Sequence, residues 1–135
     1  MKLNFLISMT VATALLGGAA FAQETMDAAQ LDALVTGNTL YVDIPAGAPG
    51  APDGGTAPIY YGVDGSAAAQ LPAGPKLVGT WALDGDQYCI DWENGPQNSC
   101  TKLMRTADGF VVMDANLGEP RGLVTLIAVG NPEDL

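Results

Sequence analysis

Histidine is absent from this 135-residue chain, and basic residues are few. Without histidine, the usual general base for a serine or cysteine nucleophile is missing, and so is the commonest nitrogen ligand of zinc. Five lysines and arginines stand against fifteen acidic residues, which gives a formal charge of −10. Nucleic acid and anionic membrane surfaces would repel such a chain. The composition therefore argues against these partners, against a zinc site and against histidine-based catalysis.

The N-terminus carries an apolar run with the features of an export signal. Residues 1–22 place Lys2 before the apolar segment, which ends in Ala20-Phe21-Ala22. Small residues at the two outer positions of this tripeptide are what a signal peptidase recognises. We therefore predict a signal peptide over residues 1–22, cleavage after Ala22 and no membrane span in the mature form. A permanent span is the alternative. Residues 23–135 then form one domain in the periplasm or outside the cell, with a formal charge of −11.

Cysteine is limited to Cys89 and Cys100. The exported compartment is oxidising, so these two residues are expected to form a disulfide. A metal site would need further soft or imidazole ligands. A hairpin that pairs the cysteines would turn at Asn94-Gly95, but Pro96 has no N–H to donate across a two-residue turn. We therefore predict a wider loop over residues 93–98, with the cysteines opposed or one step diagonal.

Turn residues divide the mature chain into seven or eight short strand patterns. Such spacing is typical of an all-β fold, a small antiparallel barrel or sandwich. The last pattern is apolar over residues 122–129 except for Thr125, which predicts a strand that is central or covered on both faces. The strands are expected over residues 39–44, 59–61, 77–83, 87–92, 98–105, 110–114 and 121–129, with residues 66–71 ambiguous between strand and helical turn.

Two segments near the start of the mature chain differ from this pattern. Thr25 can cap one short N-terminal helix that runs to about Thr36, and its apolar stripe is expected to pack on the sheet or to plug a barrel end. Residues 45–58 consist almost entirely of proline, glycine and alanine. They have little to bury, so we predict an exposed, mobile loop without a strand.

Aromatic residues are the candidates for ligand binding. Tyr88 and Trp92 alternate with polar residues along one strand, so they are expected to face the core. The same residue types can also line a site for a sugar or a small apolar ligand. The candidate set is Tyr60, Tyr61, Trp81, Tyr88 and Trp92, and the alternative is that all five are core or cross-strand pairs.

The acidic residues offer two further chemistries. Asp84 with Asp86, or Asp91 with Glu93, could act as the acid and base of a carboxylate-based hydrolase. Asp84 and Asp86 are also candidate calcium ligands, because carboxylate oxygens suit that ion. Asp-Gly-Asp is also a common sequence in turns between strands. The alternative is therefore that Asp84 and Asp86 are solvated turn residues with no catalytic or calcium-binding role. No catalytic residue and no cofactor are assigned.

Several short motifs carry resemblances to known families. Gly79-Thr80-Trp81 resembles the glycine-x-tryptophan signature of lipocalins, avidins and related calycin barrels, although there the motif lies on the first strand. The mature chain also resembles small uncharacterised exported proteobacterial proteins of the domain-of-unknown-function kind. That resemblance implies no activity. It rests on Gly37-Asn38-Thr39, Tyr61 with Asp64-Gly65, Gly79-Thr80-Trp81, Cys89 with Trp92, Cys100, and Gly130-Asn131-Pro132.

Three functional classes follow from these features. We predict an exported, non-enzymatic protein that binds a small ligand or an exported partner protein. One alternative is an inhibitor or accessory subunit of an exported enzyme, since exported bacterial protease inhibitors resemble this chain in having one disulfide and a glycine-x-tryptophan motif. The other is the carboxylate-based hydrolase. Any binding site is expected at the barrel end beside the helix, or in loops.

Overall fold

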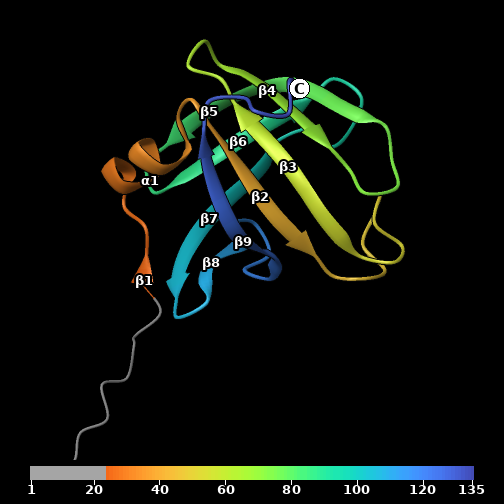
Figure 1. The fold of residues 1–135 in the computed structure, drawn as a ribbon. Coiled ribbons are helices and arrows are strands. Elements are labelled where there is room, and N and C mark those ends of the chain that lie inside the picture. The colour runs from red at the N-terminus through yellow and green to blue at the C-terminus, as the bar shows by residue number, and fades with distance from the viewer. Residues whose placement is uncertain (1–23) are drawn as a thin grey trace, which may run out of the picture.

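Residues 24–135, which the computed structural model describes, form an antiparallel β-barrel preceded by a short strand and a helix (Figure 1). The signal peptide predicted over residues 1–22 lies outside these residues. Each barrel strand pairs with the next one in sequence, and the last strand, β9, pairs back with β2, so that eight strands close on themselves. The elements are β1 (Glu24–Thr25), α1 (Ala28–Val35), β2 (Asn38–Ile44), β3 (Gly55–Tyr61), β4 (Ser66–Gln70), β5 (Lys76–Asp84), β6 (Gln87–Trp92), β7 (Ser99–Thr106), β8 (Gly109–Asp114) and β9 (Pro120–Val129).

This architecture confirms the prediction of an antiparallel all-β fold with one short helix, and it is a barrel and not a sandwich. The observed strand bounds agree with the predicted ones to within a few residues. Of the ambiguous residues 66–71, all but the last form a strand, β4. The Gly-Thr-Trp motif lies on β5, the fourth strand of the barrel, and not on the first as in the calycin signature.

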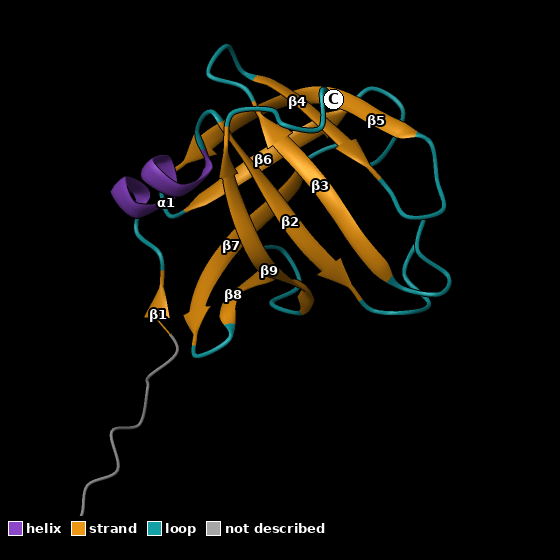
Figure 2. Ribbon diagram, in the orientation of Figure 1, coloured by secondary structure: helices purple, strands orange, loops and turns teal. Residues whose placement is uncertain are grey.

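The helix starts three residues later than Thr25, the predicted cap. Asp27 caps it instead, because its side chain accepts the N–H of Gln30 at 2.8 Å while the Gln30 side chain accepts the N–H of Asp27 at 3.0 Å. Thr25 belongs to β1, where it pairs with Met104. Leu31 and Val35 are fully buried, and α1 packs against β2, β5 and β6 at one end of the barrel (Figure 2). The expectation that the apolar stripe plugs a barrel end is confirmed.

The hairpin formed by β6 and β7 follows the prediction closely. Cys89 lies directly opposite Cys100, and the two are joined by a disulfide. The connection between the strands comprises residues 93–98, as the lack of an N–H on Pro96 implies. Tyr88 and Trp92 point into the core, so Cys89, which alternates with them, lies on the outer face.

Residues 45–58 are not the continuous exposed loop that their composition predicts. β3 begins at Gly55, and Ala51 and Ala57 are fully buried. Pro58 lies within β3, opposite Tyr41 of β2. A proline fits there because the pairing of β3 with β4 begins only at Ile59. Small alanine side chains could be buried because the neighbouring strands supply the larger side chains of the core.

The last strand, β9, is central in its hydrogen bonding, which confirms the first of the two predicted alternatives, whereas the second, that both of its faces are covered, does not apply. It pairs with β2 on one edge and with β8 on the other. Within β9 only Val124 is buried, whereas Leu126 is 56% exposed. A barrel provides one apolar interior, and nothing in residues 24–135 packs over the outer side of β9 at Leu126. The continuous apolar sequence therefore leaves large side chains facing outward.

Candidate functional site

The five aromatic residues predicted to bind a ligand do not meet at one surface. Tyr61, Trp81, Tyr88 and Trp92 are buried inside the barrel, while Tyr60 lies on the other face of β3. The Tyr61 ring packs edge-on against Trp81 and against Tyr88, with ring centroids 5.4 and 5.2 Å apart. Trp81 donates its indole N–H to the carbonyl oxygen of Gly62 at 2.9 Å. Four of the five residues thus fill the core, and no fully buried side-chain polar atom in residues 24–135 lacks a hydrogen-bond partner.

The two buried tyrosines are held in their neutral form. Burial raises the pKa of Tyr88 to about 12 and the pKa of Tyr61 well above its ordinary value. The Tyr61 hydroxyl also lies 3.5 Å from the Tyr88 hydroxyl, to which it donates. Both phenols therefore stay protonated at neutral pH.

Three of the four carboxylates predicted as acid–base pairs or calcium ligands bond to a neighbouring group, and the fourth, Glu93, is exposed at the start of the loop after β6. Asp84 accepts a hydrogen bond from the side chain of Gln87, Asp86 pairs with Lys102 at 3.2 Å, and Asp91 accepts the N–H of Asn98 at 2.6 Å. Asp64 accepts both the hydroxyl and the N–H of Ser66, which lowers the pKa of Asp64. Within residues 24–135 no three potential carboxylate, thiolate or imidazole ligands lie close enough together to hold a metal ion.

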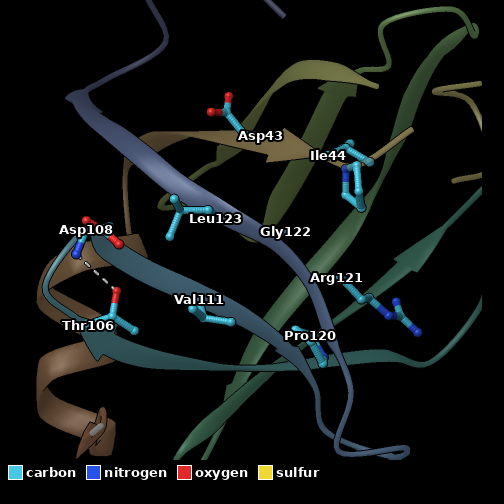
Figure 3. A pocket seen from close by; sticks show the side chains of 10 residues that line it. Asp43, Ile44, Thr106, Asp108, Val111, Pro120, Arg121, Gly122 and Leu123 are labelled. Carbon is cyan, nitrogen blue, oxygen red and sulfur yellow. Dashed lines mark hydrogen bonds between the residues drawn. The ribbon is translucent and has the colours of Figure 1, made fainter. Parts of the chain in front are cut away.

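An open depression of about 680 Å³ lies on the outer side of the barrel (Figure 3). Its lining comes from the end of β2 and the residue after it, from the end of β7 and the turn that follows, and from β8 and β9. The lining residues are Asp43, Ile44, Pro45, Thr106, Asp108, Val111, Pro120, Arg121, Gly122 and Leu123. A site was expected at the barrel end beside α1 or in loops; the depression lies away from that end and includes loop residues only at Pro45 and Asp108.

A second depression, of about 420 Å³, shares two of these residues. It is lined by Met104, Val111, Met113 and Pro120. Together the two depressions cover a continuous apolar surface on β7, β8 and β9, which we call the outer patch and define as Met104, Val111, Met113, Pro120 and Leu123.

Strand register explains why these residues are neighbours. Met104 of β7 is paired with Val111 of β8, and Val111 is paired in turn with Leu123 of β9. Leu123 is opposite Asp43 of β2, so a single row across four strands runs from a methionine to a carboxylate. Residues in one such row project on the same face of the sheet. The patch is therefore built into the rigid wall of the barrel.

A second row runs beside the first. Lys102 of β7 is paired with Met113 of β8, and Met113 is paired with Pro120 of β9. The Lys102 ammonium pairs with Asp86, 3.2 Å away, and so is directed toward the turn between β5 and β6. Each row thus has one polar end, Asp43 in the first row and Lys102 in the second, and is otherwise apolar.

Arg121 borders the patch but is already engaged. It forms an ion pair with the buried carboxylate of Asp114 and also donates to the Ser99 hydroxyl at 3.3 Å. The N–H of Leu117 is the main group that lowers the pKa of Asp114, aided by the N–H of Asn116 and by Arg121. Asp114 is therefore ionised at neutral pH and neutralises the cation beside it.

The sequence contains a signal for this surface that strand alternation alone does not reveal. Residues 110–113 are Phe-Val-Val-Met, apolar at four successive positions. Such a run predicts a strand covered on both faces. In the structure Val112 faces the core, while Val111 and Met113 remain partly exposed on the outside. Only the closed barrel shows that the outer face lacks a cover within residues 24–135.

The chain was compared with family models, curated proteins and solved structures. None of these matches it. In the part of the chain that the structure describes, no helix is long and apolar enough to cross a membrane. The assignment of a function to this chain therefore rests on the geometry of the outer patch.

Proposed function

We propose that this protein is an exported, non-enzymatic binding protein that holds another exported protein through the outer patch. The observation that carries the proposal is the apolar depression of about 680 Å³ on the outside of a barrel whose interior is filled. Exposed apolar surface of this kind is a common mark of protein interaction sites. The disulfide between Cys89 and Cys100 is compatible with an exported location.

The filled interior supports a surface site over a pocket inside the barrel. Tyr61, Trp81, Tyr88 and Trp92 occupy the space that a ligand would take in a hollow barrel. A small-molecule site normally encloses most of its ligand, whereas the depression over β8 and β9 is broad and open to solvent. A protein surface can cover such a depression.

The composition of the outer patch also suits a protein partner. Met104 and Met113 lie on neighbouring strands with Val111 between them. Methionine side chains are flexible and polarizable, and they recur at surfaces that bind other proteins. The rigid strands beneath them keep the position of the surface fixed while the side chains adapt.

Site-specific photo-crosslinking in the producing cell tests the proposal. A benzoylphenylalanine at position 111 is expected to give a discrete adduct in the exported fraction. The matched control is the same residue at position 78, because Val78 is an apolar side chain, 39% exposed, on β5. A Leu123→Asp change should remove the adduct at position 111 without lowering the thermal midpoint by more than a few degrees. Equal adducts at both positions, or none at either, would refute the proposal.

A small apolar ligand is the second candidate for the same depression. Its volume of about 680 Å³ lies within the range of small-molecule pockets. Native mass spectrometry of the protein purified from its own host distinguishes the two. A retained mass of a few hundred daltons that is lost in Leu123→Asp would favour the ligand, and a bare chain mass would favour the protein partner.

A further inference from the structure

We infer that the partner presents a segment that is both apolar and basic, with leucine- or valine-like side chains flanked by lysine or arginine. The inference rests on the proposed function and specifies the chemistry of its partner. It is carried by the charges at the border of the outer patch together with the apolar rows between them.

The two cations that border the patch on the outer face are satisfied within the chain, and Arg105, next to Met104 in sequence, packs over the Phe110 ring. Lys102 pairs with Asp86, and Arg121 pairs with Asp114. Asp114 is buried, so moving Arg121 away would leave the Asp114 carboxylate without its counter-ion at a poorly solvated site. An acidic partner would therefore have to compete with ion pairs that already exist.

The carboxylates beside the patch have neutral neighbours instead. Asp43 accepts a hydrogen bond from the Thr56 hydroxyl at 2.6 Å, which leaves its negative charge uncompensated. Asp108 lines the depression at the turn between β7 and β8, where its own N–H bonds to Thr106. Both carboxylates are exposed. A partner cation reaching either one would gain an ion pair without breaking another.

The position of Asp43 links charge to apolar contact. It continues the row of Met104, Val111 and Leu123, directly opposite Leu123 on the neighbouring strand. A segment lying along that row would place apolar side chains over β7 to β9 and its next residues beside Asp43. This register favours a basic residue immediately after an apolar stretch.

The net charge argues against a second copy as the occupant. Residues 24–135 hold four basic and fifteen acidic residues, a formal charge of −11. Two copies joined at this patch would bring their Asp43 and Asp108 carboxylates together, and like charges opposed at an interface are unfavourable. The same field attracts a basic partner and speeds its encounter.

Three synthetic twelve-residue peptides test the inference by ¹⁵N-labelled NMR titration of the mature chain. The first alternates leucine and lysine, the second replaces each lysine by glutamate, and the third replaces each leucine by serine. We expect amide shifts centred on Val111 and Leu123 with the first peptide, and affinities at least about tenfold lower for the other two. Raising the salt concentration to 0.5 M should weaken the first peptide several-fold.

Charge variants localise the effect. Asp43→Asn/Asp108→Asn is expected to weaken the leucine-lysine peptide about fivefold, because exposed ion pairs contribute modestly. The matched control is Asp84→Asn/Glu93→Gln, which removes two negative charges away from the patch, at the end of β5 and directly after β6, and should change the affinity less than twofold. Equal weakening in both variants would overturn the inference, since it would show attraction to net charge only.

The remaining outcomes separate this inference from the proposed function. If position 111 crosslinks in cells but the glutamate peptide binds as well as the lysine peptide, the basic partner is refuted and the proposed function stands. If sedimentation shows a dimer that Val111→Asp dissociates, the occupant is a second copy and the inference is overturned. If the lysine peptide shifts only residues outside the patch and position 111 gives no adduct, both are overturned.

Discussion

The replacement Gly79→Ala tests whether the Gly-Thr-Trp motif is a packing device between β5 and β6. Gly79 is paired with Trp92. A Cβ atom at position 79 would lie 2.9 Å from the Cα of Trp92 and closer still to the carbonyl oxygen of Asp91. Both atoms belong to the backbone of β6, so no side-chain rotation can relieve the contact. The two strands would have to separate where Trp92 enters the core.

The size of the effect follows from that geometry. Overpacking a close-packed site typically costs 1 to 3 kcal/mol, and a backbone clash belongs at the upper end of that range. Alanine recovers about 0.5 to 1 kcal/mol through the lower conformational entropy of the unfolded chain. The expected net loss in the free energy of unfolding is thus about 2 kcal/mol, which lowers the thermal midpoint by about 8 °C in a domain of this size.

Urea unfolding followed by tryptophan fluorescence measures this loss. The control is Gly85→Ala, because position 85 has a positive φ of 63° but nothing within 4 Å of an added Cβ. It should lose only about 1 kcal/mol, from backbone strain alone. The packing account fails if Gly79→Ala loses less than Gly85→Ala, or if its slope against urea changes enough to indicate a different folded state.

Three further predictions concern the covalent and ionisable groups of the barrel. Cys89→Ala/Cys100→Ala should lower the free energy of unfolding in urea by about 3 kcal/mol, because the disulfide closes a loop with a sequence separation of 11 residues and so restricts the unfolded chain. A loss below about 1 kcal/mol would contradict this. Stability should fall as the pH rises above about 10, because the Tyr61 and Tyr88 phenols ionise in the unfolded chain while the folded pKa of Tyr88 is about 12. Tyr61→Phe/Tyr88→Phe should therefore show a smaller fall in urea midpoint between pH 8 and 11 than the unaltered chain. The lowered pKa of Asp114 means that the ionised carboxylate stabilises the folded chain above about pH 4, and that this stabilisation is lost as the pH falls. Asp114→Asn should therefore show a smaller difference in urea midpoint between pH 6 and 3 than the unaltered chain. An equal difference would contradict a stabilising role of the ionised carboxylate.

Local patterns were sufficient for most of the barrel wall. Alternation along residues 87–92 predicts that Tyr88 and Trp92 face inward, and the structure agrees. The width of the loop between the cysteines follows from one property of Pro96, its missing N–H. Such features depend on backbone chemistry within a few residues, so they can be recognised without knowing what lies across the barrel.

The helix start and the 45–58 segment show where local patterns mislead. Thr25 and Asp27 are both residue types that cap helices. Asp27 caps α1 because Thr25 pairs with Met104, a residue far along the chain. Ala57 has no bulk of its own to predict burial, yet it is fully buried because the barrel closes over it. Both outcomes depend on strands that are distant in sequence.

The sequence by itself determined the disulfide, the antiparallel strands and the wide turn at Pro96, because each follows from the chemistry of neighbouring residues. Only the tertiary structure decided which apolar residues would be covered. The runs at residues 110–113 and 122–129 look equally buried in sequence, but a closed barrel has a single interior, so Val112 and Val124 enter it. Val111, Met113 and Leu123 are left outside, and strand register gathers them into one patch with Asp43 at its border.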